Sequence, residues 1–136
     1  MGRRLILDTN VLIDVERGTF DIGQLHDDEL AITAITIAEY RIGIELADTT
    51  ARADARTRAL TAIIGAIDVL DYTTATAAHH ARLIAHVRRA GTRREVHDLI
   101  IAAHAAETGR MVLSRDARAR FGDLPGVDTV EAWPLS

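Results

Sequence analysis

Cysteine is absent from this sequence. Its absence excludes disulfide bonds and thiolate metal sites, and with them a secreted scaffold held together by disulfides. Long hydrophobic runs are also missing. None approaches the ~20 residues that a membrane-spanning helix needs, and the N-terminus does not carry the apolar core of a signal peptide. We therefore expect a cytoplasmic protein that does not insert into a membrane.

Aromatic residues and lysine are scarce as well. Aromatics make up 4% of the chain, which disfavours the extensive base stacking that single-strand binding proteins use. Lysine does not occur, so all 16 basic residues are arginines, the side chain better suited to bidentate phosphate contacts. The formal net charge of −4 argues against non-specific binding of nucleic acid by the whole surface, but not against a local site.

The length of 136 residues and the hydrophobic content of 48% are typical of a single domain, here expected over residues 1–136. Short apolar runs, which predict strands, alternate with longer segments of helical periodicity, and Gly18, Gly91 and Gly109 mark helix ends. The connections are too long for hairpins, so we expect a three-layer α/β/α sandwich with a central, mostly parallel sheet. The predicted strands cover residues 5–7, 30–35, 67–72, 111–114 and 127–133, and the predicted helices cover 10–16, 37–47, 50–66, 74–90, 96–108 and 117–121.

Four acidic residues occupy equivalent places in this pattern. Asp8 and Asp116 follow predicted strands, Glu39 lies in the first turn of the helix after a strand, and Asp98 lies near the start of an apolar helix. The carboxyl ends of parallel strands meet at one edge, where such sheets bind ligands, so the four side chains are expected to converge. Each also has a structural explanation: helix caps for Asp8 and Asp116, the helix dipole for Asp98, and a capping box with Thr36 for Glu39.

A convergent acidic cluster needs cations to hold it together. Two carboxylates about 4 Å apart repel by roughly 4 kcal/mol at an effective dielectric constant of 20. Ligation by oxygen alone selects Mg²⁺ or Mn²⁺ rather than Zn²⁺, and such ions near carboxylates activate water and hold phosphate, so phosphodiester hydrolysis is the expected reaction. The repulsion also predicts that Asp8→Asn abolishes cleavage yet leaves the metal-free protein at least as stable as the wild type.

Several segments together resemble the ordered acidic motifs of PIN-domain nucleases, and the short chain is similar in length to the VapC toxins of bacterial toxin–antitoxin pairs. The resemblance implies a Mg²⁺- or Mn²⁺-dependent endoribonuclease, inhibited by a cognate VapB-type antitoxin and forming a homodimer. The matching segments are Leu7–Asp14, Ala38-Glu39 followed by Gly43, Asp98–Ala103, and Leu113–Asp116 with Phe121.

The resemblance also assigns roles to individual residues. Asp8, Glu39, Asp98 and Asp116 match the acidic quartet and would serve as catalytic residues and metal ligands. A metal-activated water would attack the phosphorus in line and leave a 5′-phosphate and a 3′-hydroxyl. Hydroxyl positions beside the quartet are matched by Thr9 and Ser114, and a mild departure from the family lies at Arg41-Ile42, where apolar residues are common.

Other polar residues near the inferred edge have weaker predictions. The predicted substrate-binding residues are Asn10, Arg93, Arg94 and Arg115, with the arginines directed at RNA phosphates. Asp14 is predicted to be a solvated helix residue. The predicted helices contain histidines that form no i, i+4 pair and are therefore expected on the surface or in the core rather than as ligands, although His97, beside Asp98, could touch the substrate.

Three alternative functions are weaker. A phosphatase of the haloacid dehalogenase type would use Asp8 as a nucleophile, but it needs a second acid where Asn10 stands and a lysine that the chain lacks. A catalytically silent PIN-like scaffold that binds RNA or protein would normally have lost one of the acids. Metal-dependent cleavage of DNA is the nearer alternative within the nuclease class.

Overall fold

The centre of the molecule is a parallel sheet. The computed structural model describes residues 2–116 and 119–130, and the strands within them are β1 (Arg4–Leu7), β2 (Glu29–Thr33), β3 (Asp68–Leu70), β4 (Met111–Leu113) and β5 (Asp128–Thr129). They form one sheet in the order β3-β2-β1-β4-β5, and every neighbouring pair is parallel. The central strand β1 pairs on both sides, with Leu5 opposite Leu30 of β2 and Met111 of β4.

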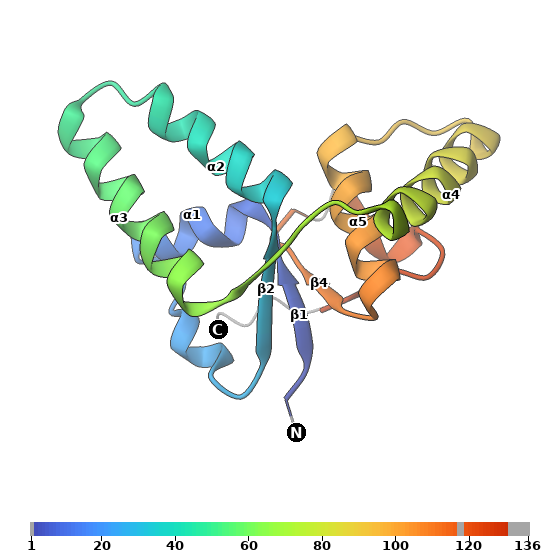
Figure 1. Ribbon diagram of the computed structural model, residues 1–136, viewed down its shortest axis with the longest axis horizontal. Helices are drawn as coiled ribbons and strands as arrows, with labels where there is room; N and C mark the ends of the chain where they lie inside the picture. The colour runs from blue at the N-terminus through green and yellow to red at the C-terminus, as the bar shows by residue number, and fades with distance from the viewer. Residues whose placement is uncertain (1, 117–118, 131–136) are drawn as a thin grey trace.

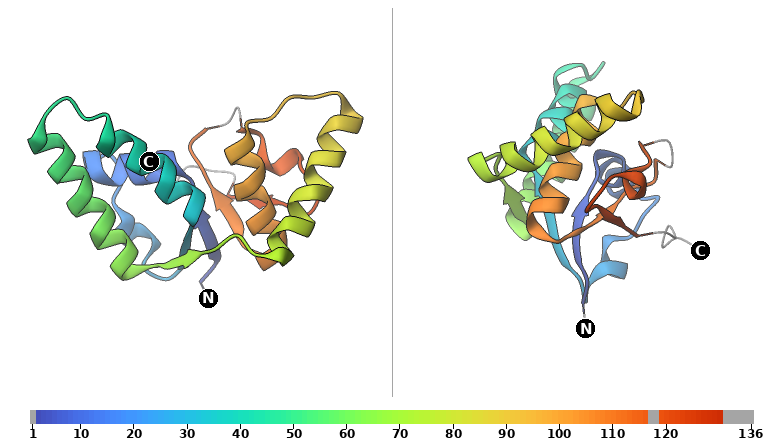
Figure 2. Two further views of the ribbon diagram at one scale, coloured as in Figure 1. Left: turned by 45° about the horizontal axis from the view of Figure 1, so that its top comes forward. Right: turned by 90° about the vertical axis from the view of Figure 1, so that its right-hand side faces the viewer.

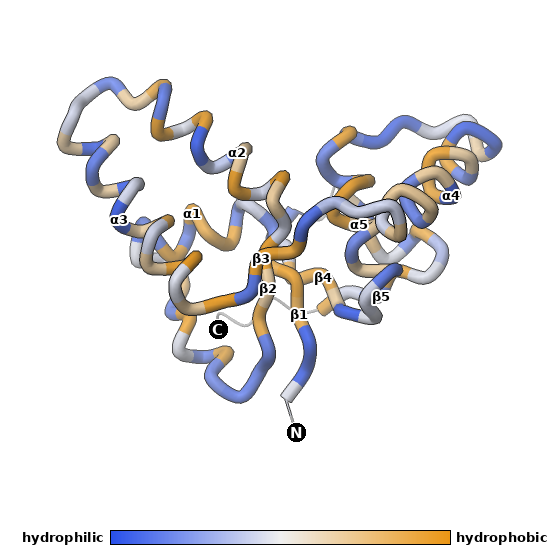
Figure 3. The backbone as a smooth tube through the Cα atoms, in the orientation of Figure 1, coloured by the Kyte–Doolittle hydropathy of each residue, from blue (hydrophilic) through white to orange (hydrophobic). Residues whose placement is uncertain are grey.

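The strand β1 is buried on both faces, as its continuous apolar run predicts. Leu5, Ile6 and Leu7 have no exposed surface. Successive side chains of a strand point to opposite faces, so Leu5 and Leu7 join one hydrophobic core and Ile6 joins the other. The central strands are among the most hydrophobic parts of the chain (Figure 3).

Helices cover both faces of the sheet. The α-helices are α1 (Thr9–Arg17), α2 (Ala34–Glu45), α3 (Thr50–Ala66), α4 (Thr74–Ala90) and α5 (Val96–Thr108), and the 3₁₀ helices include η1 (Ile22–Leu25) and η3 (Phe121–Asp123). Side chains of α4 and α5 pack in the core of Ile6, whereas those of α1, α2 and α3 pack in the core of Leu5 and Leu7. The fold is therefore the predicted three-layer α/β/α sandwich.

The two helix pairs α2–α3 and α4–α5 diverge from the sheet like the arms of a V (Figure 1), and they lie on opposite sides of it in a second view (Figure 2). The carboxyl ends of β1 and β2 point into the opening of the V. Among the described residues, none of the helices combines the length and the apolar character needed to cross a bilayer.

The predicted element boundaries differ from the observed ones at the ends of the chain and at the junction of β2 and α2, where residues 34 and 35 of the predicted strand belong to the helix. Helices α1 and α4 end where predicted, at Gly18 and Gly91, whose φ angles of 75° and 69° suit a residue without a side chain. The last strand is shorter than predicted, at Asp128–Thr129, and residues 131–133 of that prediction lie outside the described residues. So do residues 117 and 118 of the predicted helix over 117–121; the nearest described helix is η3.

Candidate active site

Asp8 is a buried acid at the junction of β1 and α1. Its backbone N–H donates to the carbonyl of Leu113 at 3.0 Å, which continues the pairing of β1 with β4 by one residue. Its carboxylate accepts hydrogen bonds from the backbone N–H of Thr9 at 2.8 Å and from Oγ of Ser114 at 2.7 Å. Asp8 therefore does cap α1, and its second oxygen lies beside the Ser114 hydroxyl at the carboxyl edge of the sheet.

Glu39 does not belong to a capping box, so that prediction is wrong. Helix α2 begins earlier than expected, because Oγ1 of Thr33, at the end of β2, accepts the backbone N–H of Thr36 at 3.2 Å. The carboxylate of Glu39 is instead held by two other helices. It accepts a hydrogen bond from Oγ1 of Thr9 at 3.0 Å and pairs with Nδ1 of His97 at 2.9 Å. His97 is thus a site residue that the sequence indicated only through its position beside Asp98.

Asp98 lies in the first turn of α5 and shares its electrostatic environment with the other three acids. Burial, as the largest cause, and the negative charges of Asp8, Asp116 and Glu39 together raise the pKa of Asp98 to about 6. The other three acids therefore lie close enough to Asp98 for their charges to act on it, in agreement with the expected convergence of four segments.

Asp8 experiences the same repulsion. Burial raises the pKa of its carboxyl group, and the charges of Glu39 and Asp116 add to the rise. The hydrogen bonds from Ser114 and Thr9 act in the opposite direction, because they stabilise the ionised form. The two hydroxyl residues assigned from the family resemblance thus contact the acids directly: Ser114 holds Asp8, and Thr9 holds Glu39.

Ser114 also fixes the loop that carries Asp116. Its Oγ accepts the backbone N–H of Asp116 at 3.0 Å and a hydrogen bond from Nδ2 of Asn10 at 3.2 Å. The other end of that amide, Oδ1 of Asn10, accepts the backbone N–H of Arg115 at 3.0 Å. Asn10 was predicted to bind substrate, but both ends of its amide serve this loop, so its contacts are those of a residue that positions the acids.

Asp14 is buried and ion-paired, so the prediction of a solvated residue is wrong. Its side chain is 4% exposed, and its Oδ2 lies 2.9 Å from Nε of Arg115. The pair joins α1 to the loop after β4, whose sequence position is about a hundred residues away, which is why helical periodicity alone did not reveal it. Arg115 therefore neutralises Asp14 with one nitrogen, while about half of its side chain, 52%, stays exposed.

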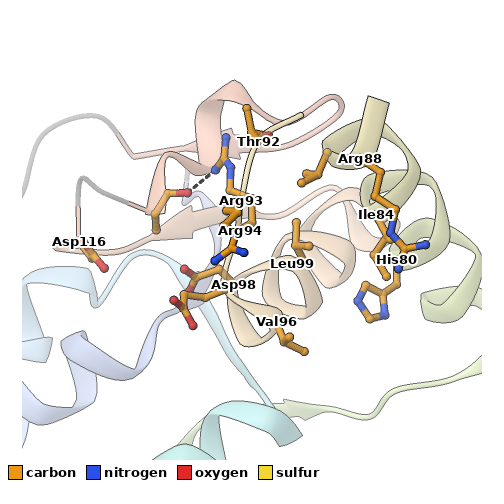
Figure 4. A pocket seen from close by; sticks show the side chains of 13 residues that line it. His80, Ile84, Arg88, Thr92, Arg93, Arg94, Val96, Asp98, Leu99 and Asp116 are labelled. Atoms are coloured by element: carbon orange, nitrogen blue, oxygen red, sulfur yellow. Dashed lines mark hydrogen bonds between the residues drawn. The ribbon is translucent and has the colours of Figure 1, made fainter. Parts of the chain in front are cut away.

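The two arginines between α4 and α5 differ in their contacts. Nη1 of Arg94 donates to the backbone carbonyls of Ala119 and Arg120, so Arg94 fastens the segment after Asp116. Arg93 is exposed. Both line a cavity of about 840 Å³ that also includes Asp98 and Asp116 (Figure 4). The acidic cluster therefore opens into a space with a cationic rim.

The cluster fits a hard divalent cation in charge and in donor chemistry. Its donors are carboxylate and hydroxyl oxygens, and bound positive charge would relieve the repulsion that raises the pKa values of Asp8 and Asp98. Within residues 2–116 and 119–130, no three histidine or acidic side chains already have the arrangement of ligands around one ion.

Comparison with known proteins identifies the class to which this fold and site belong. The PIN domain family matches residues 5–126, so the chain belongs to the PIN-domain family. PIN-domain nucleases generally use divalent metal ions, in agreement with the oxygen donors of the cluster.

Individual relatives narrow the class to VapC proteins. Ribonuclease VapC5 of Mycobacterium tuberculosis is 34% identical over 93% of this chain and 91% of that protein. The tRNA(fMet)-specific endonuclease VapC of Salmonella typhimurium is 29% identical over 96% of this chain and 98% of that protein. VapBC-5 from M. tuberculosis, a solved member of the VapBC family of toxin-antitoxin systems, matches with a TM-score of 0.78 and 29% identity over 95% of this chain and 98% of that one. These matches confirm the resemblance carried by the motifs.

Proposed function

We propose that this protein is an endoribonuclease that hydrolyses RNA phosphodiester bonds and acts as the toxin of a toxin–antitoxin pair. The observation that carries the proposal is the electrostatic coupling of four acids, which belong to four segments that meet at the carboxyl edge of a parallel sheet. The names of the relatives support RNA as the substrate, since one is a ribonuclease and another a tRNA-specific endonuclease.

The acidic quartet would hold Mg²⁺ or Mn²⁺, with Asp8, Glu39 and Asp98 as ligands and Asp116 completing the site. When bound, the ion would activate a water molecule and neutralise charge on the scissile phosphate. The remaining tasks belong to the protein. Thr9 and Ser114 lie next to the ligand carboxylates and would keep them in position.

The water would attack the phosphorus in line and leave a 5′-phosphate and a 3′-hydroxyl. Asp98, whose pKa is raised to about 6, would be largely ionised at neutral pH and so able to bind a cation. Of the predicted substrate contacts, Arg93 is the exposed residue beside the cavity and the best candidate for a phosphate. Arg94 and Arg115 bind other parts of the protein and would contribute mainly through their charge.

The protein would act in the cytoplasm as a single domain and would form a homodimer. A VapB-type antitoxin would bind it there and inhibit its activity. The solved VapBC-5 structure, which belongs to a toxin-antitoxin family, supports the antitoxin as partner. Co-expression with the product of an adjacent antitoxin gene should yield a stable complex with no ribonuclease activity.

The test is cleavage of a mixed, structured RNA pool by the purified protein, with Mg²⁺, with Mn²⁺ and with a chelator. We expect metal-dependent fragments that carry 5′-phosphates from the wild type and none from Asp98→Asn. Asp54→Asn is the matched control, because Asp54 is an exposed acid on α3 and should leave cleavage unchanged. RNA binding without cleavage under any metal would favour the scaffold alternative, and preferential cutting of a DNA pool would favour a DNA nuclease.

A further inference from the structure

The cavity beside the acidic cluster extends well beyond the residues used so far. It runs from Asp98 and Asp116 toward α4, where His80, Ile84 and Arg88 line its far end (Figure 4). Its volume of about 840 Å³ lies within the range of about 300–1,000 Å³ that is typical of sites for small organic ligands. The space can therefore accommodate a group much larger than a phosphate.

The cavity has an apolar surface next to the acids. Val96, the first residue of α5, lines it and is 66% exposed, although it is a β-branched hydrophobic side chain. Ile84, a half-buried residue, contributes from α4, and Leu99, three residues after Val96 on the same side of the helix, lies buried beneath them with 7% of its surface exposed. This surface would gain from covering by a flat apolar group, and it is continuous with the candidate active site.

Charge is divided across the cavity. Arg88 and Arg93 are exposed side chains that line it, on α4 and on the connection to α5. Glu95 and Asp98 supply negative charge from the start of α5. A ligand with one anionic group would therefore direct that group to the arginines and keep it away from the acids.

We propose that this cavity binds one unpaired nucleotide of the RNA, adjacent to the scissile phosphate. Its base would cover the exposed surface of Ile84 and Val96, and its phosphate would contact Arg88 and Arg93. The inference rests on the proposed ribonuclease function and adds a substrate requirement to it. Within an A-form duplex a base is stacked and its edges are hard to reach, so only a single-stranded or looped nucleotide could enter.

Two substitutions test the two halves of this subsite. Arg88→Gln removes a phosphate contact and Val96→Ser removes apolar surface, while Arg89→Gln is the control, since Arg89 is an exposed neighbour that does not line the cavity. RNA binding is measured by fluorescence anisotropy with a mixed-sequence single-stranded RNA across a range of salt concentrations. Mg²⁺ is present, and every protein carries Asp98→Asn to prevent cleavage.

We expect Arg88→Gln to weaken binding by roughly fivefold and to reduce the slope of log affinity against log salt by about 0.7, the value for one lost phosphate contact on a single strand. Val96→Ser should weaken binding by a similar factor without changing the slope, because no counterion is involved. Arg89→Gln should change neither. In the cleaving background, the first two variants should raise KM more than they lower kcat.

A second measurement needs no knowledge of the cleavage sequence. In methyl NMR spectra, addition of ribonucleoside 5′-monophosphates should shift the signals of Ile84, Val96 and Leu99. Methyl groups on the far side of the sheet, such as those of Leu12, should be unaffected.

Failure of the subsite is distinct from failure of the proposed function. A wild type that cleaves RNA while both cavity variants keep its KM and its salt slope would overturn the subsite alone. Variants that dissociate a homodimer but leave RNA binding unchanged would also overturn it, by assigning the cavity to a second copy.

Discussion

Replacing Asp98 by asparagine should abolish cleavage and yet stabilise the metal-free protein. Asp98 is a better choice for this test than Asp8, because the carboxylate of Asp8 also accepts structural hydrogen bonds from Thr9 and Ser114. The folded state raises the pKa of Asp98 to about 6 from its usual 3.8, through burial and the neighbouring acids. Its ionised form therefore opposes folding.

The size of the effect follows from that pKa. A change from 3.8 to about 6 corresponds to about 3 kcal/mol at 1.36 kcal/mol for each pH unit. Asp98 is only partly buried, and solvent screening reduces this to about 1–2 kcal/mol. The substitution also removes a negative charge that is favourable in the first helical turn, and this loss lowers the gain in stability by about 0.5 kcal/mol. The expected gain is therefore about 1 kcal/mol, or about 4 °C in Tm for a chain of this size.

The pH dependence gives the gain a signature. An acid whose pKa is raised by folding lowers the free energy of unfolding by its full amount when the pH is above the pKa of the folded state. The effect disappears as the pH falls to the pKa of the unfolded state. The advantage of Asp98→Asn over the wild type should thus be complete at pH 8, shrink below pH 6 and vanish near pH 4. Thermal unfolding followed by circular dichroism, in buffer with a chelator, measures it.

Two comparisons make this experiment decisive. Mg²⁺ should raise the Tm of the wild type more than that of Asp98→Asn, because the variant has lost a ligand. Asp14→Asn should change stability in the opposite direction, by about 1–3 kcal/mol, since Asp14 is a buried acid with a cationic partner in Arg115. A lower Tm for Asp98→Asn at pH 8, or a difference that does not depend on pH, would refute the repulsion argument.

Three further predictions concern individual contacts. Ser114→Ala removes a hydrogen bond to Asp8 and should slow RNA cleavage by roughly tenfold in steady-state assays, and unchanged activity would contradict the positioning role. Tyr40→Phe removes the 3.0 Å hydrogen bond from a buried hydroxyl to Glu16 and should cost about 1–2 kcal/mol in urea unfolding, with no change in cleavage rate. Leu12→Ala creates a cavity at a fully buried position and should cost about 2–5 kcal/mol in the same assay; a cost below 1 kcal/mol would mean that the core relaxes around it.

The sequence by itself determined the order and type of the elements and the positions of the acids along them. Hydrophobic periodicity is a local property, so the buried strand of Leu5 to Leu7 and the helices that end at Gly18 and Gly91 could be predicted without any knowledge of their neighbours. Parallel topology then brought the ends of the strands to one edge, which is why the convergence of Asp8 and Asp116 was predictable.

Only the tertiary structure decided which side chains meet at that edge. Glu39 could have closed a capping box within its own helix, but Thr33 takes the capping role and leaves Glu39 to contact Thr9 and His97. The pairing of Asp14 with Arg115 depends on how α1 is rotated against the sheet. Such contacts join residues far apart in the chain, and their geometry is set by how helices pack on a sheet, which the local pattern of a sequence does not specify.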